Sequence, residues 1–145
     1  MTRLKNYYKQ FEQKLHDLND PPTKKAVAGF LIHDWNLKVE QGTKYGVDLI
    51  CYRGDKVVVY AEVERRTVWQ NEFPFKTLHI PERKRKFCFL DAPTIFFSCN
   101  ENLQKAFWVK GQYVVESPIV QLDTRHSSHE PFFDVPLNRC RGVKL

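Results

Sequence analysis

The spacing of apolar residues changes from a helical to a strand period near residue 37. An apolar stripe at spacings of three and four predicts an amphipathic N-terminal helix over residues 3–19, formed by Leu4, Tyr8, Phe11, Leu15 and Leu18. Two consecutive prolines, Pro21 and Pro22, end this pattern. Thr23 can cap a second helix over residues 24–36.

Short runs of β-branched and aromatic residues follow, separated by turns that contain glycine, and they predict an antiparallel meander over residues 37–40, 46–52 and 56–64. Pro74 and Pro81 exclude one continuous helix over residues 67–90, but Pro81 can occupy the first turn of a helix over residues 83–90. Further strands are predicted at residues 94–99, 105–110 and 113–115.

This order predicts an α/β fold in which helices flank a mixed sheet (α+β), built as one domain over residues 1–145. Within it we expect an N-terminal helix, a core over residues 23–115 and a surface-wrapping tail over residues 116–145. The longest apolar run is about five residues, far short of the roughly 20 that a membrane helix needs. The first residues also lack the apolar core of a signal peptide. We therefore expect a cytoplasmic, intracellular protein that has no membrane partner.

The positive charge of the chain is concentrated in one segment. The net charge is +6, and seven basic and two acidic residues between Arg65 and Lys86 give this segment a net charge of +5. Such a block predicts a phosphate-binding surface, because each neutralised phosphate releases counterions. We expect nucleic-acid contacts from Arg65, Arg66, Arg83, Lys84, Arg85 and Lys86. Trp69 and His79 can stack on bases; packing in the core is the alternative.

Two carboxylates lie at the end of the third predicted strand. Side chains alternate along a strand, so Glu62 and Glu64 share one face. Asp48 lies across a short hairpin, and cross-strand neighbours are about 5–8 Å apart. We therefore expect three carboxylates to converge on a hard cation, Mg²⁺ or Mn²⁺, with the carbonyl oxygen of Val63 as a further ligand. The alternative is that both glutamates are half-exposed and paired with neighbouring basic residues.

Asp48, followed after thirteen residues by Glu62-Val63-Glu64, resembles the motif of the PD-(D/E)xK nuclease superfamily. The predicted order helix, three strands, helix, strand over residues 23–110 is similar too. The resemblance implies a restriction-endonuclease-like core of order α-βββ-α-ββ and metal-dependent hydrolysis of phosphodiester bonds, in DNA rather than RNA. Glu64 stands where the superfamily pattern has a lysine. Lys84 or Lys76 could replace that lysine, or Glu64 itself could act as general base.

Two other functions remain open at this point. A nuclease-like fold without catalysis could bind nucleic acid or a nucleic-acid enzyme, and Glu64 in place of the lysine favours it. A protein-interaction module could use the basic segment to bind an acidic partner. A homodimer is also conceivable for the nuclease, since cutting two strands usually takes two sites.

Overall fold

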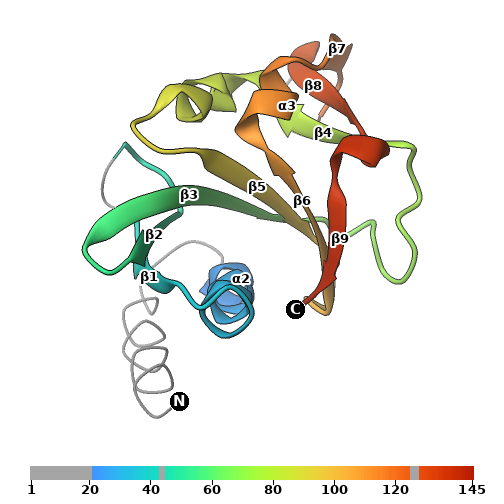
Figure 1. Ribbon diagram of the computed structural model, residues 1–145. Helices are drawn as coiled ribbons and strands as arrows, with labels where there is room; N and C mark the ends of the chain where they lie inside the picture. The colour runs from blue at the N-terminus through green and yellow to red at the C-terminus, as the bar shows by residue number, and fades with distance from the viewer. Residues whose placement is uncertain (1–20, 43–44, 125–127) are drawn as a thin grey trace.

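A six-stranded mixed sheet is central to the computed structural model, which describes residues 21–42, 45–124 and 128–145 (Figure 1). Its strand order is β1-β2-β3-β5-β6-β9, with bounds β1 Lys38–Gln41, β2 Leu49–Arg53, β3 Lys56–Arg65, β5 Thr94–Cys99, β6 Lys105–Lys110 and β9 Arg141–Lys144. Strands β1, β2 and β3 form an antiparallel meander, as the sequence predicts. The helix expected over residues 3–19 lies outside the described residues.

Strands β3 and β5 are parallel, so the chain must cross over between them. The crossover contains β4 (Thr77–Pro81) and the 3₁₀ helix η1 (Glu82–Phe89). Pro81 ends β4 and comes directly before η1, at the position where the sequence predicts a helix start. Strand β4 was not predicted, because the prolines on either side of it obscure its alternating pattern.

A second sheet of three strands has the order β4-β8-β7, with β7 Ile119–Leu122 and β8 Glu130–Pro136. The prediction of a surface-wrapping tail is therefore wrong: Phe133 and Val135 of β8 are fully buried. Pro131 and Pro136 lie near the two ends of β8, where the missing N–H is tolerated. The strand predicted over residues 113–115 is instead part of a short helix, α3 (Gly111–Val115).

The two faces of the six-stranded sheet support separate apolar clusters. Helix α2 (Pro21–His33) covers one face, while η1, α3 and the second sheet lie on the other (Figure 1). Along β3, Val59 and Ala61 belong to the cluster under α2, whereas Tyr60 belongs to the opposite cluster. This alternation turns Glu62 toward the side of η1, which decides what the carboxylate can meet.

Candidate functional site

Two hydrogen bonds join Asp48 and Glu62. The backbone N–H of Asp48 donates to Oε2 of Glu62 at 2.7 Å, and the N–H of Val63 donates to Oδ2 of Asp48 at 2.9 Å. The last residue pair between β2 and β3 is Leu49 opposite Ala61. Beyond it, the Asp48 carboxylate accepts the hydrogen bond from the N–H of Val63 in place of a backbone carbonyl. Both carboxylates are thereby fixed side by side at the end of β2.

Close backbone contacts hold Asp48 at this place. The N–H of Gly42 donates to the carbonyl oxygen of Asp48 at 2.9 Å. A Cβ at position 42 would lie 1.8 Å from the carbonyl oxygen of Val47, so only glycine permits this approach. Tyr45 and Gly46 then turn the chain back with positive φ angles of 63° and 78°. The fixed backbone aims the Asp48 side chain at β3.

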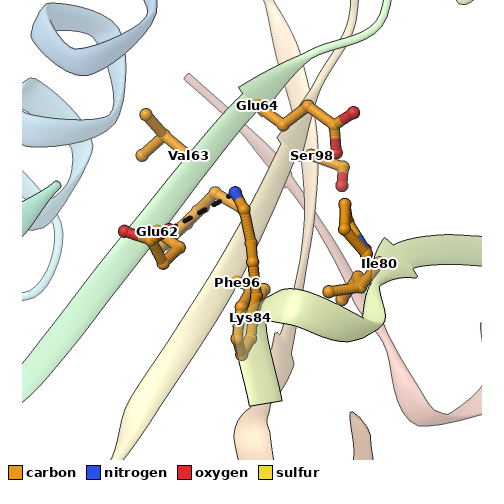
Figure 2. A pocket seen from close by; sticks show the side chains of 9 residues that line it. Glu62, Val63, Glu64, Ile80, Lys84, Phe96 and Ser98 are labelled. Atoms are coloured by element: carbon orange, nitrogen blue, oxygen red, sulfur yellow. Dashed lines mark ion pairs between the residues drawn. The ribbon is translucent and has the colours of Figure 1, made fainter. Parts of the chain in front are cut away.

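A lysine of η1 forms an ion pair with the Glu62 carboxylate. The ammonium nitrogen of Lys84 lies 3.3 Å from Oε1 of Glu62, and the Lys84 side chain is only 21 % exposed. Figure 2 shows this side chain reaching from η1 to the Glu62 carboxylate. The sequence offers Lys84 or Lys76 as a substitute for the lysine that the superfamily pattern has at position 64. Lys76 is exposed and is not among the residues that line this pocket.

A second lysine, Lys24, pairs with Asp48 and was not recognised in the sequence. Its ammonium nitrogen lies 3.4 Å from Oδ1 of Asp48, and its side chain is 14 % exposed. Lys24 belongs to the first turn of α2, where the helix dipole makes a cation unfavourable. A lysine in the first turn of a predicted helix is the only sequence signal for Lys24. It points to a buried ion pair only when Asp48 is known to lie beside it.

The Glu62 carboxylate is poorly solvated. Its side chain is 5 % exposed, and burial raises the pKa of Glu62 to about 7. The charge of Lys84 opposes this rise in the pKa, while the charge of Asp48 adds to it. The desolvation of the Glu62 carboxylate thus outweighs its attraction to Lys84.

Glu64 does not join this pair, and the prediction that three carboxylates converge is wrong. Its Oε2 lies 3.3 Å from the guanidinium of Arg66, and Figure 2 shows the carboxylate on the Ser98 side of the pocket, away from that of Glu62. Side chains two positions apart share a face but are separated by about 7 Å along a strand. Glu62 turns to Asp48, whereas Glu64 turns to Arg66. For Glu64, the paired and partly exposed alternative is the correct one.

The remaining pair can serve as an open site for a hard cation. No three His, Cys, Asp or Glu side chains of the described residues gather into a metal-binding group, so a closed cage is absent from this part of the chain. Mg²⁺, however, is commonly bound by one or two carboxylates together with water and substrate phosphates. Oδ1 of Asp48 and Oε1 of Glu62 face ammonium groups, which a cation can replace. Two carboxylates side by side are oxygen donors of the kind that Mg²⁺ and Mn²⁺ take.

A small pocket adjoins Glu62 and Lys84. Its volume of about 10 Å³ corresponds to roughly one water molecule. It lies between β3, β5 and the junction of β4 with η1 (Figure 2), and it is lined by Glu62, Val63, Glu64, Ile80, Pro81, Lys84, Phe96, Phe97 and Ser98. Val63 is thus near the site as predicted; a role of its carbonyl oxygen as a ligand stays a prediction.

Two residues expected to contact nucleic acid are instead structural. Trp69 is 3 % exposed, and its ring stacks on Phe107 with centroids 5.2 Å apart, so it cannot stack on a base without leaving the core. Arg66 is 16 % exposed and pairs with Glu64, and its guanidinium also donates to the carbonyl oxygen of His79. Arg66 therefore ties the end of β3 to β4.

The other candidate residues remain accessible to different degrees. Arg65 and Lys86 are exposed. Arg83 is 68 % exposed and pairs with Glu130 at 2.6 Å. Two further residues have partners within the fold: Arg85 pairs with Glu82 and lies over the ring of Phe133, and His79 pairs with Asp134 at 3.0 Å. Two exposed cations of the basic segment, Arg83 and Lys86, thus lie on η1, the element that also carries Lys84.

Comparison with known proteins adds no assignment to this geometry. No helix in the described ranges is long and apolar enough to cross a bilayer. No protein-family model matches the chain, and no curated protein gives a significant match to it.

Proposed function

We propose that this protein is a divalent-cation-dependent nuclease of the PD-(D/E)xK type, most simply a DNA endonuclease, whose lysine comes from η1 instead of β3. One observation carries the proposal. Asp48 and Glu62 are locked together by hydrogen bonds of 2.7 and 2.9 Å, and the Lys84 ammonium lies 3.3 Å from the same Glu62. Two acids and a lysine that meet beside β3 are groups that metal-dependent phosphodiester hydrolysis can use.

The order of the elements supports the same proposal. Helix α2 precedes the meander β1-β2-β3, the chain crosses over through η1, and β5 then pairs in parallel with β3. Apart from β4, and with a 3₁₀ helix in the crossover, this order is compatible with the helix, three strands, helix, strand that the superfamily resemblance implies. We propose a restriction-endonuclease-like core on this basis, in which β4 and the second sheet are additions.

The proposed chemistry assigns a role to each charged group. A cation bound here would stabilise the negative charge that develops on the phosphate and would promote deprotonation of water. Asp48 and Glu62 are the residues that would hold that cation. Lys84 keeps its ammonium beside Glu62, where it can orient the attacking water or compensate charge on the phosphate. Glu64, paired with Arg66, positions the end of β3.

The surface beside the site favours nucleic acid as the substrate. Arg83 and Lys86 project from η1, the element that also supplies Lys84 to the pocket. A phosphate backbone bound along the outer side of η1 would therefore be near Glu62. We propose DNA as the partner, and cleavage of both strands would need two copies of this site, as in a homodimer.

The test compares cleavage by the intact protein with that by its site variants. Plasmid, branched DNA and RNA are incubated with Mg²⁺ or Mn²⁺ and with wild-type protein, Asp48→Asn, or Asp55→Asn as a control for the loss of one negative charge at an exposed turn. We expect cation-dependent cleavage by the wild type and the control, and none by Asp48→Asn. Equal activity of Asp48→Asn and wild type would refute the proposal.

A binding function without catalysis is the second candidate. It is favoured by the Glu64–Arg66 pair, which occupies the position where the superfamily pattern has its lysine. In this case no substrate is cleaved with either cation. Nucleic-acid binding is then retained and weakens strongly between low and moderate salt.

A further inference from the structure

Lys24 is held where helix electrostatics disfavour a cation. It lies in the first turn of α2, which contains no acidic residue, and the N-terminus of a helix carries positive partial charge. The side chain is nonetheless largely buried, with its ammonium 3.4 Å from Oδ1 of Asp48. The ion pair with Asp48 offsets the unfavourable placement of this charge. Lys24 thus brings its positive charge to one carboxylate of the site.

The charges of the site cancel in pairs. Asp48 is matched by Lys24, and Glu62 is matched by Lys84. A divalent cation in contact with both carboxylates must compete with both ammonium groups for Oδ1 and Oε1. Its entry leaves two largely buried ammonium groups without carboxylate partners, which is unfavourable. A nucleic-acid backbone supplies the missing negative charge, one unit for each phosphate.

We propose that Lys24 is a phosphate-positioning residue, held by Asp48 in the free protein and released to a backbone phosphate when a divalent cation takes Asp48. This inference rests on the proposed function and extends the site from the sheet to α2. Lys24 would couple the binding of two ligands, a divalent cation and a phosphodiester. Each increases the affinity of the protein for the other, because coupling between two binding equilibria is reciprocal.

Two binding measurements on the full chain test this role without cleavage. In the first, the affinity for Mn²⁺ alone is measured from the electron paramagnetic resonance of the free ion. Lys24→Met removes a competing charge and is expected to bind Mn²⁺ about tenfold more tightly than the wild type. Lys24→Arg keeps the charge and is expected to resemble the wild type.

In the second measurement, fluorescence anisotropy gives the affinity for a labelled DNA duplex with and without Ca²⁺, a hard cation that takes the same oxygen ligands. We expect Ca²⁺ to strengthen duplex binding about tenfold for the wild type and hardly at all for Lys24→Met. Lys56→Met, which removes an exposed charge at the start of β3, controls for net charge in both experiments. Thermal melting checks folding, and Lys24→Gln replaces Lys24→Met if the latter does not fold.

The outcomes separate this inference from the proposed function. If Asp48→Asn loses Mn²⁺ binding but Lys24→Met binds Mn²⁺ no more tightly than the wild type, the role of Lys24 is wrong and the cation site stands. If Lys24→Met keeps the full Ca²⁺ effect on duplex binding, the phosphate role is wrong. If neither the wild type nor Lys24→Met binds Mn²⁺, or Asp48→Asn binds it equally well, the proposed function fails with the inference.

Discussion

The ammonium nitrogen of Lys84 lies 3.3 Å from Oε1 of Glu62, although β4 and a long loop separate the two residues along the chain. The contact exists because the crossover between the parallel strands β3 and β5 lays η1 over the end of β3. A lysine on β3 itself is therefore not required for a lysine to reach the acidic pair.

If the proposed function is right, replacing Lys84 by Met should reduce cleavage about a hundredfold, because the charge proposed to orient the water or compensate the phosphate is lost. The same substitution at Lys76, which is exposed and outside the pocket, should leave the rate within twofold. Rates on one DNA substrate at saturating Mg²⁺ give the comparison. A larger loss at Lys76 than at Lys84 would show that η1 does not supply the functional lysine.

Replacing Glu62 by Gln should change how stability depends on pH. Burial raises the pKa of Glu62 to about 7 in the folded protein, above its ordinary value of 4.5. The proton bound to folded Glu62 therefore stabilises the wild type fully below about pH 4.5, and this contribution is lost as pH rises through 7. Relative to the wild type, Glu62→Gln should gain up to roughly 3 kcal/mol between pH 4.5 and pH 8.

Urea unfolding of both proteins across this range measures the effect. Glu64→Gln, which removes a carboxylate from the same face of β3, serves as the control and should show no such gain. A constant difference in the free energy of unfolding between Glu62→Gln and wild type would mean that Glu62 is not desolvated as the structure has it.

Replacing Trp69 by Ala should destabilise the fold by about 3–5 kcal/mol, because a large buried ring is lost from its contacts with Phe73 and Phe107. Phe75→Ala, at a half-exposed ring, should cost less than about 1 kcal/mol. Chemical denaturation gives both values. Normal stability of Trp69→Ala combined with weakened nucleic-acid binding would restore the base-stacking role that burial argues against.

Arg83 and Lys86 offer a test of the phosphate surface. Each Ala substitution should lower the slope of log affinity against log salt concentration for a DNA duplex by about one, because one phosphate contact is lost. Arg53→Ala, at the opposite end of β2 from Asp48, should leave the slope unchanged. Equal slopes for all three variants would place the nucleic acid elsewhere on the molecule.

Several elements of the fold follow from local patterns alone. The helical stripe within α2 and the apolar, β-branched and aromatic runs of β2, β3, β5 and β6 are strong signals, because each of these elements buries one or two faces in the core. Five others were missed: β4, β7, β8, β9 and α3. The prolines around β4 and within β8 hide their strand pattern, and α3 is too short for a helical period to be distinguished from a strand.

The sequence by itself determined that Asp48 and Glu62 belong to neighbouring strands of a hairpin and that basic residues follow Glu62, since strand alternation and hairpin geometry are local properties. Only the tertiary structure decided which charges meet. Glu64 pairs with Arg66 and lies apart from the other two acids. Lys24 of α2 pairs with Asp48, and Lys84 of η1 pairs with Glu62. A long side chain pairs with whatever opposite charge the packing of distant elements brings within reach, and no local period of the chain encodes that choice.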